Sequence, residues 1–238
     1  MEKNSIIDLV FPRRCPFCGE VRAYGDKWEC DKCSNELPWI EKPVCLKCGK
    51  TISSPELQYC GDCERIPKSF ERCYPVFSYE GTVRDSIYEF KYKNQREYAA
   101  FYCECILKRY GSELRGLLID GIVPVPVHSH KKRVRGYNQA ELIARELGKR
   151  LGISVYGNYI VRSTDTNPQK ELDDRERMKN LKNAFKIGEN SVKLNTVLLV
   201  DDIYTSGATM EACTSTLLHG GVNSVYCVSV AIGRGYDD

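Results

Sequence analysis

The fold is indicated by VLLVDDIYTSGAT, residues 197–209, in which four apolar residues lead into two carboxylates. The apolar residues predict a buried strand, and a turn of hydroxyl side chains and glycine follows the acids. Neighbouring side chains of a strand point to opposite faces, so each acid inside a covered sheet would need a partner. We therefore predict that Asp201 and Asp202 lie just past the carboxyl end of the strand, where open α/β sheets bind ligands.

The turn after the acids has the composition of a phosphate-binding loop. Thr205, Ser206, Gly207, Ala208 and Thr209 supply hydroxyls and backbone N–H groups at the start of a predicted helix, and the glycine permits close approach. Carboxylates beside a phosphate would repel it unless they face other groups, and sugar hydroxyls with Mg²⁺ meet that condition. The alternative is that the hydroxyls only cap the helix. The order of the whole stretch favours a phosphorylated ribose with Mg²⁺.

Residues 71–238 alternate predicted strands and helices. Strands are indicated by CYPVFSYEG, GIVPVPV, TVLLV and SVYCVSVAI. Helices are indicated by a pattern over residues 82–110 that breaks near KNQ, by QAELIARELGKRL and by residues 208–218. This alternation predicts an α/β fold in which helices flank a parallel sheet. We place a domain boundary near residue 70, which separates a small module at residues 1–70 from the sheet domain at residues 71–238.

Eight of the 13 cysteines form four C-x-x-C pairs whose first members are 15 residues apart. Tetrahedral Zn²⁺ takes two thiolates from each of two such pairs, whereas a disulfide framework has no reason for this spacing. CPFCG and CLKCG carry a glycine that CDKC and CGDC lack, so the repeat is 30 residues long, which favours two sequential sites over a cross-braced pair. The predicted zinc ligands are Cys15, Cys18, Cys30 and Cys33 in one site, and Cys45, Cys48, Cys60 and Cys63 in the other.

Both zinc sites are expected to be structural, because four thiolate ligands leave no coordination position for water. Residues 1–70 carry 11 basic and 11 acidic side chains, so we do not expect this module to grip DNA by charge alone. A local face with Arg13, Arg14 and Arg22 stays open as a nucleic-acid contact. The remaining cysteines are interpreted as core residues: Cys73, Cys103, Cys105, Cys213 and Cys227.

Charge and hydropathy limit the remaining classes of function. The formal net charge is +3, from 35 basic and 32 acidic residues, which is a weak bias for a protein that binds nucleic acid. No apolar run approaches the roughly 20 residues that span a bilayer. SIIDLVF, residues 5–11, is too short for a signal peptide and lacks a cleavage site. We therefore expect a cytoplasmic protein without membrane insertion.

VLLVDDIYTSGAT resembles the 5-phosphoribosyl-1-pyrophosphate (PRPP) motif of type I phosphoribosyltransferases. The whole chain resembles the ComF family of competence-associated proteins, which join an amino-terminal zinc ribbon to such a domain. The resemblance extends over IIDLVFPRRCPFCG, YEGTVRDSIYEFKYKNQ, PVPVHSHKKRVRGYNQAELIA and VRSTDTNPQKELDDRERMKNLKNAF. It implies that Asp201 and Asp202 hold the ribose hydroxyls as the catalytic acid pair, while residues 205–209 wrap the 5-phosphate.

The resemblance assigns two further segments of the chain. It places the pyrophosphate loop at HSHKKRVRGYNQ, where Arg133 and Arg135, with Lys131 and Lys132 beside them, offer an anion site. It also implies that residues 162–185 form a mobile hood loop that closes over the substrate. The alternative is that this segment is an exposed helix with i,i+4 charge pairs. The candidate contacts of the hood loop are Arg162, Thr166, Gln169, Leu172, Arg177, Asn180 and Phe185.

Two functions from different classes stay open at this stage. The first is a PRPP-dependent enzyme of pentosyl transfer, in which Mg²⁺ and basic groups stabilise the departing pyrophosphate. The second is a non-catalytic accessory protein of the DNA-uptake machinery that binds a ligand or single-stranded DNA and works with a competence helicase. The acidic and phosphate motifs favour the first, or a ligand-sensing form of the second. The sequence does not name an acceptor.

Overall fold

The computed structural model describes residues 12–23, 26–162, 184–189 and 192–233. Within these residues, four parallel strands form the central sheet in the order β1-β6-β5-β2. A separate antiparallel pair joins β3 to β4. The strands are β1 (Arg72–Ser78), β2 (Gly121–Pro124), β3 (Ile160–Arg162), β4 (Phe185–Ile187), β5 (Thr196–Tyr204) and β6 (Ser224–Ile232).

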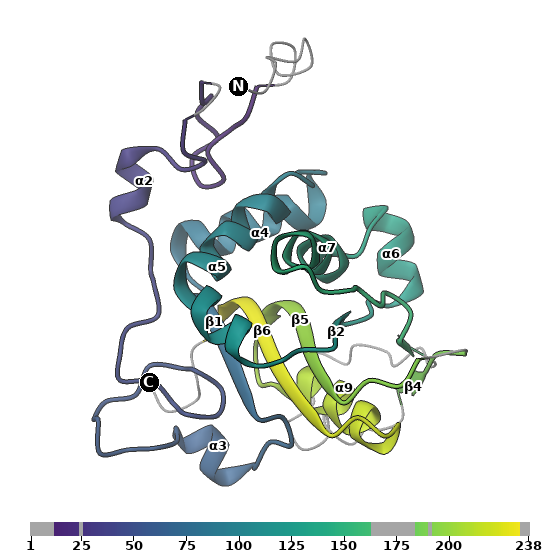
Figure 1. The fold of residues 1–238 in the computed structure, drawn as a ribbon. Helices are drawn as coiled ribbons and strands as arrows, with labels where there is room; N and C mark the ends of the chain where they lie inside the picture. The colour runs from purple at the N-terminus through teal and green to yellow at the C-terminus, as the bar shows by residue number, and fades with distance from the viewer. Residues whose placement is uncertain (1–11, 24–25, 163–183, 190–191, 234–238) are drawn as a thin grey trace.

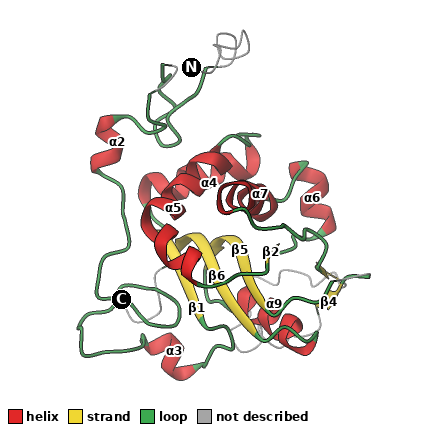
Figure 2. Cartoon of the chain, in the orientation of Figure 1, coloured by secondary structure: helices red, strands yellow, loops and turns green. Residues whose placement is uncertain are grey.

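Helices cover both faces of the central sheet, as Figures 1 and 2 show. α4, α5 and α7 lie on one face and α9 lies on the other, which confirms the predicted α/β architecture. None of the described helices is long and apolar enough to span a bilayer. The helices that the structure describes in this domain are α4 (Gly81–Tyr92), α5 (Tyr98–Gly116), α6 (Ser129–Arg135), α7 (Gln139–Leu151) and α9 (Ala208–His219).

The apolar run of β5 is buried on both sides. Leu198 and Val200 belong to the hydrophobic cluster that includes α4, α5 and α7, whereas Val197 and Leu199 belong to the cluster that includes α9. All four side chains are fully buried. Because alternate side chains of a strand point to opposite faces, a continuous apolar run is what a strand covered on both sides requires.

The second half of the cysteine-rich segment is hydrogen-bonded to the sheet domain. The backbone N–H of Ile40 donates to the carbonyl of Val76 at 3.1 Å, and the N–H of Cys73 donates to the carbonyl of Lys47 at 2.7 Å. Phe70 and the second set of predicted zinc ligands lie in the same core cluster as α9. The division at residue 70 therefore stays a prediction, and β1 begins two residues after it.

The cysteines outside the C-x-x-C pairs are buried, which confirms their interpretation as core residues. Burial raises the pKa of Cys73 and of Cys103 to about 12 each, so both thiols stay protonated at neutral pH. Only the thiolate is a strong nucleophile, so these positions serve packing and not covalent chemistry.

Candidate functional site: two cysteine clusters and the carboxyl edge of the sheet

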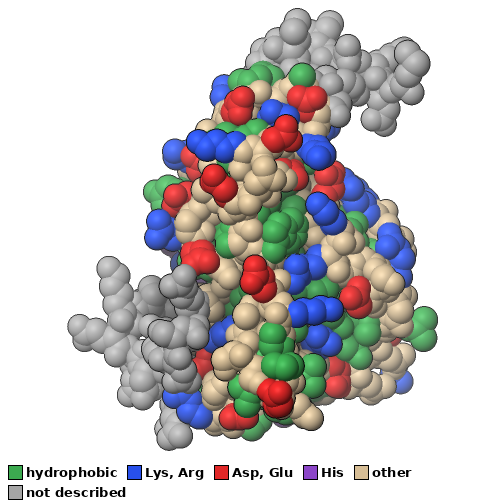
Figure 3. Space-filling model, turned by 90° about the vertical axis from the view of Figure 1, so that its left-hand side faces the viewer, with side chains coloured by type: hydrophobic (Ala, Val, Ile, Leu, Met, Phe, Trp, Pro, Cys, Tyr) green, Lys and Arg blue, Asp and Glu red, His purple; other side chains and the backbone are tan. Residues whose placement is uncertain are grey.

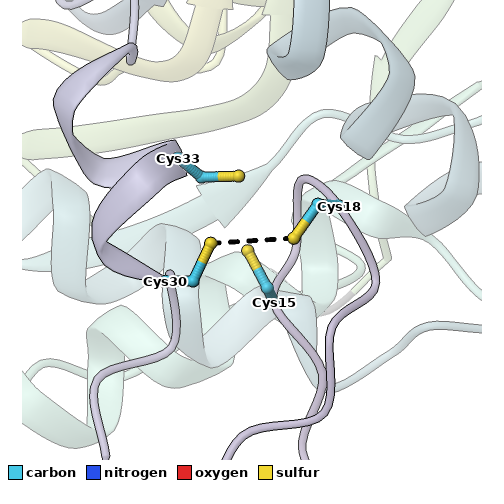
Figure 4. Close-up of side chains that lie close together, drawn as sticks. All are labelled: Cys15, Cys18, Cys30 and Cys33. Atoms are coloured by element: carbon cyan, nitrogen blue, oxygen red, sulfur yellow. Dashed lines mark hydrogen bonds between the residues drawn. The ribbon is translucent and has the colours of Figure 1, made fainter.

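Two clusters of four cysteines confirm the sequential pairing of the C-x-x-C pairs. The sulfur atoms within each cluster lie within 4.8 Å of one another. Figure 4 shows the first set, whose sulfur atoms come together, with the Sγ atoms of Cys18 and Cys30 at 3.7 Å. The clusters are Cys15, Cys18, Cys30 and Cys33, and Cys45, Cys48, Cys60 and Cys63.

Both clusters are built from the same backbone unit. In each, the glycine after the first C-x-x-C pair donates its N–H to the carbonyl of the first cysteine, at 2.9 Å for Gly19 and 3.0 Å for Gly49. These glycines have φ of 74° and 77°, a left-handed conformation that favours glycine. A short helix begins directly after the first cysteine of the second pair and carries the second cysteine: α2 (Asp31–Asn35) in one unit and α3 (Gly61–Arg65) in the other. This geometry fits structural Zn²⁺, because four thiolates fill the tetrahedral coordination sphere of the ion.

The three arginines of the predicted nucleic-acid face are engaged within the first zinc unit. The guanidinium of Arg13 lies 4.8 Å from the ring centre of Trp28, and Arg22 pairs with Asp26 at 3.5 Å. Arg14 donates to a backbone carbonyl at 3.0 Å. Figure 3 shows acidic and basic side chains interspersed over the face drawn, in line with the equal numbers of the two charges in this segment.

Asp201 and Asp202 lie inside β5, and the prediction that they follow the strand is wrong. β5 continues to Tyr204 because it pairs with β6 along its whole length. On the other side of β5, β2 ends at Pro124, which is paired with Val200. The acids therefore belong to the strand but lie beyond the end of its neighbour, at the carboxyl edge where open α/β sheets bind ligands.

The two carboxylates have different partners. Oδ2 of Asp202 lies 3.0 Å from Nζ of Lys91 on α4, and these side chains are only 11% and 17% exposed. Oδ1 of Asp201 accepts a hydrogen bond from the backbone N–H of Asp202 at 2.8 Å. Burial, and then the Asp202 carboxylate, raise the pKa of Asp201 to about 8, against the opposing effects of Lys91 and Arg135. Asp201 is therefore mostly protonated at neutral pH.

The predicted basic loop forms the short helix α6. Lys131 and Arg135 are four residues apart and share one side of it, whereas Arg133 is two residues from Arg135 and so lies about 200° away around the helix. Partial burial, and then the positive charges of Arg135, Arg162 and Lys91, lower the pKa of Lys131. The charge of Arg135 acts on Asp201, Lys131 shares the side of α6 on which Arg135 lies, and Arg133 lies on the other side of this helix. Lys91 had no distinguishing signal in the sequence, because its partner is 111 residues away.

The loop of residues 205–207 connects β5 directly to the first turn of α9. Gly207 has φ of 76°, and a Cβ at this position would overlap the hydroxyl of Tyr204. Only glycine fits this turn without rearrangement. The Oγ of Ser206 accepts from the N–H of Ala208 at 3.4 Å, so a helix-capping contact is also present. The loop places the amino-terminal N–H groups of α9 next to the acid-bearing strand.

An exposed pair of tyrosines, which the sequence analysis missed, belongs to the same region. Tyr88 and Tyr92 are one turn apart on α4, with ring centroids at 4.9 Å and exposed fractions of 56% and 53%. The guanidinium of Arg135 lies 4.9 Å from the ring centre of Tyr92 and donates to its hydroxyl at 2.9 Å. The available signal was the i,i+4 spacing of two tyrosines on the polar side of a predicted helix.

Two of the predicted hood-loop contacts are described. Arg162 on β3 pairs with Phe185 on β4, and its guanidinium lies 5.6 Å from the phenylalanine ring centre. Five other predicted contacts lie outside the described residues: Thr166, Gln169, Leu172, Arg177 and Asn180.

Comparisons with known families match both parts of the chain. The double zinc ribbon domain matches residues 6–64, and the phosphoribosyl transferase domain matches residues 134–236. Together with the parallel sheet and the two cysteine clusters, these matches define a phosphoribosyltransferase-domain protein with an amino-terminal double zinc ribbon.

Similar proteins extend over nearly the whole chain. It is 30% identical over 220 residues to DNA utilization protein YhgH of Escherichia coli strain K12, covering 91% of this chain and 96% of that one. It is 29% identical over 227 residues to Competence protein F of Haemophilus influenzae, covering 90% and 95%. It is 25% identical over 205 residues to Competence protein ComFC of Bacillus subtilis, covering 82% and 80%. The chain belongs to the ComF family.

Proposed function

We propose that the carboxyl edge of the sheet binds PRPP with Mg²⁺ and that the protein acts in competence and DNA uptake, as the names of its relatives suggest. The observation that carries this proposal is the position of Asp201 and Asp202. Both acids lie on β5 directly before the loop of residues 205–207, and the charge of Arg135, which shares one side of α6 with Lys131, acts on Asp201. PRPP is a sugar with an anionic group at each end, so it needs hydroxyl acceptors between two anion sites.

Each part of the ligand then has a chemical counterpart in the protein. The carboxylates accept hydrogen bonds from the ribose hydroxyls, and the N–H groups of residues 205–207 receive the 5-phosphate. Lys131 and Arg135 receive the pyrophosphate. Mg²⁺ keeps several waters and binds through one or two carboxylates plus substrate phosphates, so two acids beside a pyrophosphate site fit this ion. When bound, Mg²⁺ neutralises part of the pyrophosphate charge.

The same arrangement supports pentosyl transfer as the reaction. The bond between the anomeric carbon and the pyrophosphate oxygen breaks, pyrophosphate leaves with the electron pair, and the acceptor forms the new bond. Lys131 and Arg135 stabilise the departing charge, and the acid pair fixes the orientation of the sugar. No nucleophilic side chain is needed, in agreement with the burial of the non-ligating cysteines.

Calorimetric titration of the zinc-loaded protein with PRPP and Mg²⁺ tests the proposal. We expect saturable binding that the double variant Asp201→Asn, Asp202→Asn loses while its zinc content is unchanged. Arg135→Met and Arg133→Met form a matched pair on opposite sides of α6. The first should weaken binding by about tenfold or more, and the second by less than about twofold. Binding that survives in the double variant, or equal losses in the matched pair, would refute the assignment.

A second candidate function is binding of single-stranded DNA, and the observation that favours it is the exposed tyrosine pair. Unpaired bases stack on aromatic side chains in single-strand binding proteins, and nearby cations hold the phosphates. Tyr88 and Tyr92 offer two such rings, and Arg135 lies over the second. A base stacked there would lie next to the proposed PRPP site.

Fluorescence anisotropy with a labelled single-stranded oligonucleotide tests this second function. Tyr88→Ala with Tyr92→Ala should weaken binding by about tenfold or more, since each stacked base contributes roughly 1–3 kcal/mol. Tyr59→Ala is the control, because Tyr59 is exposed but lies in the zinc ribbon. Binding should also weaken with salt. Equal affinity of the two variants, or an affinity independent of salt, would exclude this surface.

A further inference from the structure

A lysine that follows the matched double zinc ribbon, residues 6–64, lies against the proposed phosphate loop. Lys68 follows the last zinc ligand by five residues and is only 7% exposed. Its Nζ lies 3.4 Å from the carbonyl oxygen of Ser206. Within the described part of the chain this carbonyl is its one hydrogen-bond partner. A buried ammonium with a single, distant neutral acceptor keeps most of its charge uncompensated, and that charge lies beside the loop.

The two residues after Lys68 fix its position. The backbone N–H and the Oγ of Ser69 both donate to the carboxylate of Glu211 in the first turn of α9, at 2.8 and 2.5 Å. Phe70 is fully buried, and its ring meets that of Tyr204 edge-on with centroids 6.3 Å apart. Three consecutive residues after the second zinc site, 68–70, therefore contact the end of β5, the loop and the start of α9.

These contacts change the electrostatic potential at the loop. The carboxylate of Glu211 lies in the first turn of α9, where a negative charge competes with a phosphate for the amino-terminal N–H groups. Ser69 donates to both carboxylate oxygens and so competes with the N–H groups of the loop for them. Lys68 adds a positive charge on the carbonyl side of the loop. Both effects favour an anion at residues 205–207.

The second zinc site holds this segment, and the first does not. α3 carries the ligand Cys63 and ends three residues before Lys68. The thiols of the second site belong to the core cluster that includes α9. The first zinc unit packs elsewhere, because Phe17 contacts Phe101 on α5 with ring centroids 5.4 Å apart. Loss of the second zinc ion would therefore release the segment that contacts the loop.

We propose that the zinc ribbon, through residues 68–70 that follow its second zinc site, completes the phosphate site of the sheet domain. Lys68 is a positioning residue that orients and charges the loop of residues 205–207 for the 5-phosphate, and the second zinc site holds Lys68 in place. This inference rests on the proposed function, because the 5-phosphate belongs to PRPP. It gives the zinc ribbon a direct part in ligand binding.

The first experiment titrates the full zinc-loaded chain with ribose 5-phosphate and, separately, with pyrophosphate. Lys68→Met should lower the affinity for ribose 5-phosphate about tenfold, which corresponds to about 1.4 kcal/mol, and leave pyrophosphate binding unchanged. Lys68→Arg keeps the charge and should bind ribose 5-phosphate within about threefold of the wild type. Lys27→Met is the control, because Lys27 is exposed in the first zinc unit. This control should change neither affinity.

The second experiment compares the two zinc sites. Each double variant should retain one zinc ion per chain, measured by metal analysis. Cys60→Ser with Cys63→Ser should lower the affinity for ribose 5-phosphate at least as much as Lys68→Met does. Cys30→Ser with Cys33→Ser should leave it unchanged. If either cysteine variant fails to fold, Lys68→Met alone decides, since it removes no zinc ligand.

The outcomes separate this inference from the proposed function. If the wild type binds PRPP and Lys68→Met binds ribose 5-phosphate as tightly, the inference is refuted and the proposed function stands. A parallel loss of ribose 5-phosphate and pyrophosphate binding would also refute it, because it indicates general damage. Equal losses in the two cysteine variants would overturn the role of the second zinc site. No binding of PRPP or ribose 5-phosphate by the wild type would refute both proposals.

Discussion

Asp201 should destabilise the folded protein at neutral pH, so Asp201→Asn should raise the free energy of unfolding there. Burial and the neighbouring Asp202 carboxylate raise its pKa from 3.8 to about 8 in the folded state. The folded protein therefore binds one more proton than the unfolded chain between these two pH values. Its free energy of unfolding must fall as pH rises through this window. Asparagine carries no charge and retains the Oδ1 that accepts from the backbone N–H of Asp202.

The size of the effect follows from the difference between the two pKa values. At pH 7 the Asp201 carboxyl is ionised in the unfolded chain and mostly protonated in the folded protein. This difference lowers the free energy of unfolding by about 4 kcal/mol at pH 7 and by about 2 kcal/mol at pH 5. Asp201 keeps some contact with solvent, so both figures are upper limits. The gain in stability from Asp201→Asn should thus grow by up to about 2.5 kcal/mol from pH 5 to pH 7.

Urea denaturation of wild type and variant at pH 5, 6, 7 and 8, without added Mg²⁺, measures this difference. Titration of the zinc thiolates changes the free energy of unfolding of both proteins equally, so it cancels in the difference between them. Asp85→Asn, an exposed position on α4, is the control and should give a difference that stays constant with pH. A constant difference for Asp201→Asn, or a variant less stable than the wild type at pH 7, would refute the reasoning.

Three further predictions follow from the same site. Binding of Mg²⁺ and PRPP at pH 7 should release about one proton per chain, because the cation ionises Asp201, and calorimetry in two buffers of different ionisation enthalpy should show different heats. Gly207→Ala should lower the free energy of unfolding by about 3 kcal/mol, and Gly152→Ala should lower it by about 1 kcal/mol. Both glycines have positive φ, but only at Gly207 would a Cβ meet a neighbouring side chain. Urea denaturation that gives the same loss of unfolding free energy for both variants would contradict this prediction. Lys91→Met should lower the free energy of unfolding by about 3 kcal/mol, because it leaves the Asp202 carboxylate without its partner. Adding Asp202→Asn should lower it little further. If denaturation shows that the losses of the two single variants add in the double variant, the two side chains are not a coupled pair.

Much of the fold was predictable because its signals are local. The four apolar residues before Asp201 identify β5, and the spacing of Ala140, Ile143 and Leu147 identifies one buried side of α7. The repeat of the cysteine pairs predicted both clusters, because the ligands of each site lie within 19 consecutive residues. In these cases, strand alternation, helical periodicity or short ligand spacing carries the information.

The end of β5 was not predictable from its own residues. Apolar patterning ends at Val200, but pairing with β6 carries the strand on to Tyr204. The hydrogen bonds of a partner strand, rather than burial, decide where a strand ends. The consequence is that both acids are held by the sheet itself, and Asp201 loses hydration that a loop residue would keep.

The sequence alone determined the ligand chemistry of the zinc sites and the order of acids, hydroxyls and glycine, because neighbouring residues supply these groups. The tertiary structure decided which charges meet. Lys91 reaches Asp202 from α4, the charge of Arg135 on α6 acts on Asp201, and Lys68 reaches the carbonyl of Ser206 across 138 residues. Charge pairing depends on distance in space, and packing of the helices and zinc ribbon against the sheet sets those distances.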